Sequence, residues 1–298
     1  MLTVHNFSYG LLTPALAYLM SFVGSFVGLR CTSRARACTG SARRGWLLVA
    51  GISFGVTGIW VMHFIAMLGL SIPGQVIRFN VPITLGSMLT AVAFVLLGLM
   101  IVGFGPATNW ALVLAGIVTG IGIAAMHYTG MAAMEAQMRM TYNPLLFVAS
   151  VIVAIVAATA ALWAALRLST VWSTLAAAAI MGVAVSGMHY TGIAAMRVYS
   201  APPGTMSMNG ANATAFLLPL IIGVSVLTFV LTATIALSPT EAELTAEADL
   251  MRRIDDVRAQ AQVPEFPLAM STAKRERRWR PPAARQLDPH PAIALAVA

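Results

Sequence analysis

Met126-His127-Tyr128-Thr129-Gly130-Met131 closes one long apolar stretch of this chain, and the pattern recurs as Met188-His189-Tyr190-Thr191-Gly192-Ile193 and, in shorter form, as Met62-His63-Phe64. A tryptophan precedes each histidine by the same 17 residues: Trp46, Trp110 and Trp172. At about 1.5 Å per helical residue this interval spans about 25 Å. A tryptophan at one membrane interface therefore places its histidine most of the way across a hydrocarbon core of roughly 30 Å. The sequence predicts three histidines at one depth, which suggests a shared site.

Composition indicates an integral membrane protein. Hydrophobic residues make up 59% of the 298 residues and charged residues only 9%, and the mean hydropathy of +0.83 is outside the range of a soluble domain. We predict an all-α, polytopic membrane protein with seven transmembrane helices. The predicted spans are approximately residues 9–29, 46–70, 83–104, 110–134, 145–166, 172–196 and 215–237.

The net charge of +8 is explained by topology, and no nucleic-acid partner is expected. The first connector carries Arg30, Arg34, Arg36, Arg43 and Arg44, and nine more basic residues follow Leu237. The connectors after the second, fourth and sixth predicted spans, on the other side of the membrane, hold only Arg78, Arg139 and Arg197 near helix ends. By the positive-inside rule we predict a multi-pass protein of the bacterial inner membrane, with its amino terminus outside and its carboxyl terminus in the cytoplasm. This orientation puts all three histidines near the external face. Cys31 and Cys38 then fall on the cytoplasmic side, where we expect ordinary reduced thiols.

The spacing of the motifs indicates a threefold repeat. His63 to His127 is 64 residues and His127 to His189 is 62, so the unit is a helical hairpin and the chain is three hairpins plus a seventh helix. Pro82 and Pro144 each precede the next tryptophan by 28 residues and suit the first turn of a helix. We predict a membrane domain over residues 1–237, with motif copies near 62–67, 126–134 and 188–196. Residues 238–298 are predicted to form a cytoplasmic tail.

At 100° per residue, the histidine face of two helices also carries small residues. Gly116 and Gly120 share the face of His127, and Ala178 and Gly182 share that of His189. Small residues let membrane helices approach closely, so we expect these faces to point inward. The helix of His63 fits less well, because Ile52 and Val56 occupy the corresponding positions.

The residue types around the histidines favour a copper site. Intramembrane histidines are functional candidates, although three imidazoles could also simply hydrogen-bond between helices. Thioether sulfur favours Cu(I), imidazole suits copper, and the only acidic residue in the spans is Glu135 at an edge, which argues against a carboxylate-driven proton pump. The candidate ligands are His63, His127 and His189 with Met62, Met67, Met126, Met131, Met134, Met188 and Met196.

Two tyrosines follow their histidines directly, Tyr128 and Tyr190. They could hydrogen-bond a neighbouring ligand or cofactor, serve as redox-active phenols, or anchor the membrane interface. Phe64 cannot supply a hydroxyl, so a strictly threefold tyrosine role is excluded. Only the second copy has His127, Tyr128, Met131 and Met134 together, and we expect it to dominate if one unit binds the metal.

These motifs resemble those of the MHYT-domain family of bacterial integral membrane sensor proteins, over about residues 8–237. The resemblance implies a seven-helix sensor domain that binds copper and, through it, senses a diatomic gas such as O2, CO or NO. The positions that match the family motif are Met62 and His63 in the first copy, Met126, His127, Tyr128 and Met131 in the second, and Met188, His189 and Tyr190 in the third. Phe64 departs from the family pattern, and Ile193 replaces the expected downstream methionine.

Many relatives in that family carry a cytoplasmic output domain, whereas the tail of this chain shows no kinase, cyclase or DNA-binding motif. We expect a stand-alone form with a short amphipathic helix, opened by a capping box at residues 238–241. A basic, proline-containing and disordered stretch is expected to follow, and its run from Lys274 to Arg280 could bind lipid headgroups.

The leading functional hypothesis is a sensor, not an enzyme, that binds copper and responds to a diatomic gas or to copper itself. Its partners would be membrane lipid, the gas and a separate cytoplasmic signalling protein. Two alternatives stay open: a haem-binding redox or electron-transfer protein with axial histidine or methionine ligands, and a copper transporter.

Overall fold

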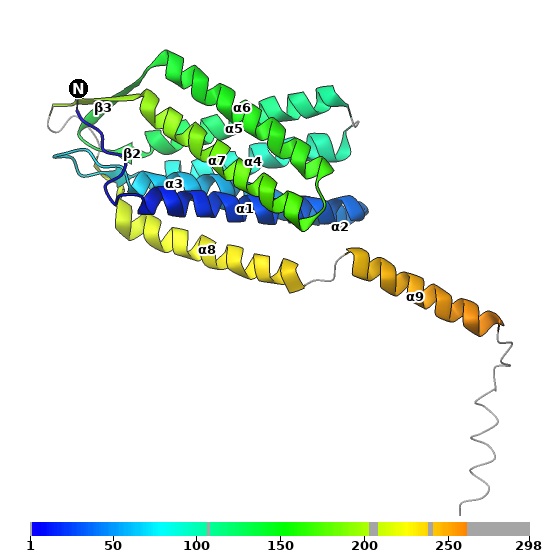
Figure 1. The fold of residues 1–298 in the computed structure, drawn as a ribbon. Helices are drawn as coiled ribbons and strands as arrows, with labels where there is room; N and C mark the ends of the chain where they lie inside the picture. The colour runs from blue at the N-terminus through cyan, green and yellow to red at the C-terminus, as the bar shows by residue number, and fades with distance from the viewer. Residues whose placement is uncertain (1, 106–107, 203–207, 238–240, 261–298) are drawn as a thin grey trace, which may run out of the picture. The chain divides into compact units, whose positions relative to one another are not determined.

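The protein is described from a computed structural model, over residues 2–105, 108–202, 208–237 and 241–260. The chain divides into two units, residues 1–241 and 242–298, which are treated separately. The first unit is almost entirely helical (Figure 1). Its helices are α1 (Leu12–Ala37), α2 (Gly40–Ile52), the π-helix η1 (Ser53–Val61), α3 (Met62–Leu68), α4 (Val81–Phe104), α5 (Asn109–Ala132), α6 (Pro144–Arg167), α7 (Val171–Ala195) and α8 (Ala213–Leu237).

Six helical segments are long and apolar enough to cross a membrane: α1, α4, α5, α6, α7 and the continuous run of α2, η1 and α3 over Gly40–Leu68. The all-α, multi-pass membrane class predicted from the sequence is therefore confirmed. Helix α8 contributes a shorter apolar stretch, Ala213–Thr228. The seventh span, and with it the layout of three hairpins plus one helix, stays a prediction.

Side-chain caps fix where the helices begin. Asn80 and Asn143 accept hydrogen bonds from the first free backbone N–H groups of α4 and α6, and Thr108 and Thr170 do the same for α5 and α7. Pro144 is the first residue of α6 and Pro82 the second of α4. Both positions lack an intrahelical N–H partner in any case, so proline costs nothing there. The predicted role of the two prolines is confirmed.

The six segments pack into a closed ring. Contacts run from α1 to η1, then through α4, α5, α6 and α7, and α7 packs back against α1. Figure 1 shows α1 and α7 side by side, although they are the first and the last of the six segments along the chain. Helix α8 packs on α1 and η1.

Short strands join the connectors at one end of the ring, which is called the histidine end below (Figure 1). Strands β1 (Arg78–Phe79), β2 (Met134–Glu135) and β5 (Ala211–Asn212) form one antiparallel sheet in the order β2-β1-β5. Strands β3 (Met138–Tyr142) and β4 (Met196–Ser200) form a second, with Met138 opposite Ser200 and Tyr142 opposite Met196. No strands were predicted from the sequence. Strands β1, β2 and β5 have two residues each and are too short to show a period of two, whereas β3 and β4 do alternate over five residues, a signal that the prediction missed.

Arginines at the opposite end, the arginine end, cap helix termini. Arg36 donates to the backbone carbonyls of Ala165 and Leu168 at the end of α6, and Arg43 donates to that of Gly103 near the end of α4. Cations and N–H donors stabilise the unpaired carbonyls of a helix C-terminus. The predicted first connector was too long, since α1 continues to Ala37 and carries Arg30, Arg34 and Arg36 within the helix.

The π-helix explains why the helix of His63 fitted the predicted face poorly. Over Ser53–Val61 the backbone forms wider turns than an α-helix, so the rotation per residue is less than the assumed 100°. Close packing accompanies the π-helix: a Cβ atom added to Gly24 of α1 would overlap the backbone N of Gly58 and lie 2.6 Å from its Cα atom. The prediction of a regular α-helix over this stretch was wrong, and Ile52 and Val56 do not occupy the face assigned to them.

The second unit is described through α9 (Glu241–Gln260), which lies where the sequence analysis expected a helix. Arg252 and Asp249 form an exposed ion pair at 3.7 Å. Three residues of the predicted capping box, 238–240, lie outside the described residues, as does the basic run from Lys274 to Arg280.

Candidate metal centre

Three histidines from three helices meet inside the ring. His63 comes from α3, His127 from α5 and His189 from α7, and each is only 1% exposed. The Nδ1 atom of His63 lies 2.9 Å from that of His189 and 3.1 Å from that of His127. The ring centroids are 4.9–5.1 Å apart, with the planes nearly perpendicular. The shared site suggested by the motif spacing thus exists as a compact triad.

The three imidazoles cannot satisfy one another. An imidazole nitrogen carries either one proton or one lone pair, so His63 Nδ1 can complete only one of its two short contacts. The Nδ1 atom of the third histidine then faces the same point without a hydrogen-bond partner in the triad. A cation at that point would accept all three lone pairs at once. Among the residues that the structure describes, this is the one group of three histidine, cysteine or acidic side chains whose ligand atoms could hold a metal ion.

The spacing of the nitrogens suits a small metal ion. Metal–imidazole bonds of 2.0–2.1 Å place three ligand nitrogens about 3.3–3.5 Å apart, and the ligand atoms of the triad all lie within 4.8 Å of one another. Imidazole donors suit copper, zinc, iron or nickel. The donor set therefore fits the predicted copper, and geometry alone does not distinguish it from the other three.

Glycines pack against the Nε2 edges of two of these imidazole rings, and they were not among the residues predicted from the sequence. A Cβ atom on Gly130 would lie 2.6 Å from Nε2 of His63, and one on Gly192 would overlap Nε2 of His127. The Nε2 atoms of all three histidines are buried and have no hydrogen-bond partner in the described structure. The signal was present in the motif, since both complete copies have glycine three residues after histidine.

The predicted methionine ligands all lie in the core. Met62, Met67, Met126, Met131, Met134, Met188 and Met196 are each at most 5% exposed. Each precedes or follows a triad histidine by no more than seven residues. Their thioethers are therefore buried, within two helical turns of a triad histidine along the chain, and their role as ligands stays a prediction.

The two tyrosines differ in their hydrogen bonding. The ring of Tyr128 packs edge-on against His127 at 4.9 Å, while its hydroxyl shares a 2.7 Å hydrogen bond with Ser150 of α6. Tyr190 packs against His189 at 5.1 Å, but its buried hydroxyl finds no partner among the described residues. Both rings therefore contact the triad, and the Tyr128 hydroxyl is engaged elsewhere.

Glu135 is occupied in the strands of the histidine end. Its carboxylate accepts hydrogen bonds from Gly210 N at 2.7 Å and from Asn80 Nδ2 at 3.0 Å. These contacts tie together β2, the cap of α4 and the segment before β5. This acidic residue at the edge of a span thus has a hydrogen-bond partner on each carboxylate oxygen.

Comparison with known proteins identifies the class of this membrane domain. A family model described as a bacterial signalling protein N-terminal repeat, MHYT, matches residues 57–116 and 120–178. The two matched repeats contain His63 and His127, and His189 follows them. Residues 57–178 therefore contain MHYT repeats, as the motifs indicated.

Several curated bacterial proteins are similar to this chain. It is 36% identical to the bifunctional diguanylate cyclase/cyclic di-GMP phosphodiesterase MucR of Pseudomonas aeruginosa over 193 residues, covering 63% of this chain and 28% of MucR. The cyclic di-GMP phosphodiesterase NbdA of the same organism is 36% identical, with 68% and 26% covered. The signaling protein YkoW of Bacillus subtilis is 28% identical, with 66% and 26% covered. The chain thus matches about a quarter of the length of these relatives. No solved structure matches it.

Proposed function

We propose that this protein is a non-enzymatic inner-membrane sensor in which His63, His127 and His189 hold a copper ion. The observation that carries the proposal is the convergence of three Nδ1 atoms on one buried point. A bound ion would supply a redox-active centre that can bind a small ligand. The chain's own residues would bind the ion, orient it and exclude water from it.

The choice of copper over other metals rests on the buried methionines that lie close to the three histidines in sequence. A three-histidine set would also suit zinc, but seven buried methionines lie within seven residues of the triad. Soft thioether donors favour Cu(I). The proposed signal is a diatomic gas (O2, CO or NO) or copper itself.

The proposed output is a movement of α3, α5 and α7, because each contributes one histidine. A change at the triad would alter the packing of three helical segments that all begin at the arginine end, which is the predicted cytoplasmic side. A separate cytoplasmic signalling protein would read that movement. The relatives supply support, since MucR and NbdA are named for cyclic di-GMP enzymes and share this membrane region.

The geometry of the triad favours a bound metal ion in a sensor over the two alternatives, a haem-binding redox protein and a copper transporter. Two haem axial ligands lie on opposite faces of a macrocycle, whereas these imidazole nitrogens are 2.9 and 3.1 Å apart. A copper transporter would need ligands along the bundle. One helical turn from the triad, toward the arginine end, the corresponding residues are Ile59, Ile123 and Val185, which offer none.

Elemental analysis of the purified protein tests the site. We expect about one copper per chain after reconstitution, a loss of at least tenfold in copper affinity for His127→Ala, and no change for His5→Ala, an exposed histidine outside the triad. A protein that retains no copper, or a His127→Ala variant that holds as much as wild type, would overturn the assignment. A Soret band in the same sample would favour haem.

A further inference from the structure

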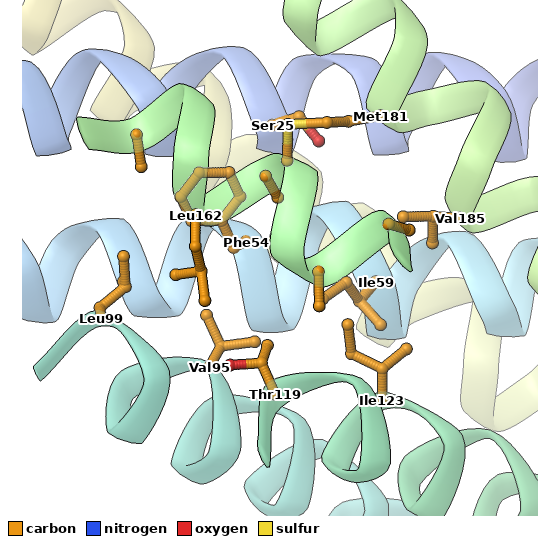
Figure 2. A pocket seen from close by; sticks show the side chains of 14 residues that line it. Ser25, Phe54, Ile59, Val95, Leu99, Thr119, Ile123, Leu162, Met181 and Val185 are labelled. Atoms are coloured by element: carbon orange, nitrogen blue, oxygen red, sulfur yellow. The ribbon is translucent and has the colours of Figure 1, made fainter. Parts of the chain in front are cut away.

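An apolar cavity lies inside the ring, one helical turn from the triad. Its volume is about 40 Å³. Three of its lining residues, Ile59, Ile123 and Val185, each precede a triad histidine by four residues. Four residues rise about 6 Å along a helix, so the cavity begins directly below the imidazoles. Figure 2 shows these three residues together at one end of the cavity and Leu99 at the other.

Small side chains of α6 create the space. Ala157, Ala158, Ala161 and Ala165 line one wall of the cavity, where larger residues would fill it. The other lining side chains are apolar except for the hydroxyls of Ser25 and Thr119, and the Thr119 hydroxyl already donates to the Phe94 carbonyl at 3.4 Å. A water molecule needs two to four polar partners, and apolar cavities of this kind stay dry yet bind apolar guests.

The direction of the helices turns the triad toward the cavity. Side chains on an α-helix tilt toward its N-terminus. Helices α5 and α7 run from the arginine end to the histidine end, as does the segment Gly40–Leu68 that carries His63. All three imidazoles therefore lean toward the cavity. At the other side, the strands cover the histidine end, where the triad is 1% exposed.

We propose that this cavity is a binding site for an uncharged, apolar molecule of two or three heavy atoms. The size of the cavity excludes larger guests, and its apolar walls exclude ions. A guest held there would lie within one helical turn of the three Nδ1 atoms. The idea that the bound molecule then reaches a metal ion at the triad rests on the proposed function. Binding of the molecule in the cavity does not depend on that proposal.

Xenon is the probe, because it is apolar, of suitable size and inert toward metals. The metal-free protein in lipid nanodiscs is titrated with xenon and followed by 129Xe NMR. Two cavity-filling variants, Val185→Leu on α7 and Ala158→Leu on α6, are compared with Val183→Leu and Ala160→Leu. The latter two residues are exposed on the same helices, so they are matched controls for protein and lipid background.

We expect a saturable xenon shift for wild type and both controls, and its loss in both filling variants. If one filling variant does not fold, the other provides the same comparison. The proposal is overturned if wild type gives no saturable shift, or if the filling variants retain it. Copper analysis of the same proteins separates the two proposals: a xenon site in a protein that binds no copper supports the cavity and refutes the metal centre.

Discussion

Gly192 of α7 lies directly against the Nε2 edge of His127 of α5, so closely that no side chain fits between them. The pair shows how the triad is held: the backbone of one helix supports the imidazole of the next. Gly130 has the same relationship to His63. The glycine of the motif therefore acts on a histidine from a different copy, which the linear pattern does not reveal.

The first prediction concerns this support. Gly192→Ala inserts a methyl group into the space of His127 and displaces the ring without removing a ligand. Loss of the groups that orient a metal-binding histidine typically lowers affinity 10–100-fold, and we expect a loss of about that size for copper, measured by competition with a chelator. Gly187→Ala is the control on the same helix, because a Cβ atom there meets nothing within 4 Å. Equal affinity of the two variants would contradict the support role.

The two tyrosines give a prediction about stability. Tyr128→Phe removes the hydrogen bond to Ser150 and should lower the free energy of unfolding by about 1 kcal/mol. Ser150 keeps its own bond to the Phe147 carbonyl, so no larger loss is expected. Tyr190→Phe should be neutral or slightly stabilising, because its buried hydroxyl has no partner in the described structure. Thermal unfolding of both variants in one detergent measures the difference, and a greater loss for Tyr190→Phe would show that its hydroxyl has a partner in the folded protein.

Glu135 gives a prediction about the strands. Glu135→Ala removes the acceptor for Gly210 N and Asn80 Nδ2 and should cost about 1.5–3 kcal/mol, as for hydrogen bonds to charged groups. We expect faster hydrogen exchange at Gly210 and in β1, with the interior of α5 unchanged. Glu135→Gln keeps an oxygen acceptor and should lie between wild type and the alanine variant. Unchanged exchange in Glu135→Ala would show that this carboxylate does not tie the strands together.

Tyr142 of β3 gives a prediction about pH. Burial, with a smaller contribution from the neighbouring Tyr128, raises the pKa of Tyr142 from 10.0 to about 12. Because the unfolded chain loses this proton first, the stabilising contribution of Tyr142 is complete below pH 10 and is lost between pH 10 and about 12. The phenolate absorbance of wild type minus that of Tyr142→Phe should titrate near 12. A difference spectrum with a midpoint near 10 would contradict the burial.

Much of the site was predictable from the sequence. The constant interval from tryptophan to histidine needs only the rise of a helix, and it correctly placed His63, His127 and His189 together. The rotation of the helices was harder. The interval to His63 passes through the π-helix Ser53–Val61, where a uniform 100° per residue gives the wrong face.

The sequence by itself determined the class of this protein and the depth of its histidines, because hydropathy and helical rise are local properties that each segment carries alone. The tertiary structure decided what depends on several segments at once. Closure of the ring between α1 and α7 turned the histidines toward one point, and pairing of the connectors formed the strands. The alanines of α6 left a cavity only because five other helical segments surround it. Packing against distant parts of the chain sets these features, and no short stretch of sequence encodes them.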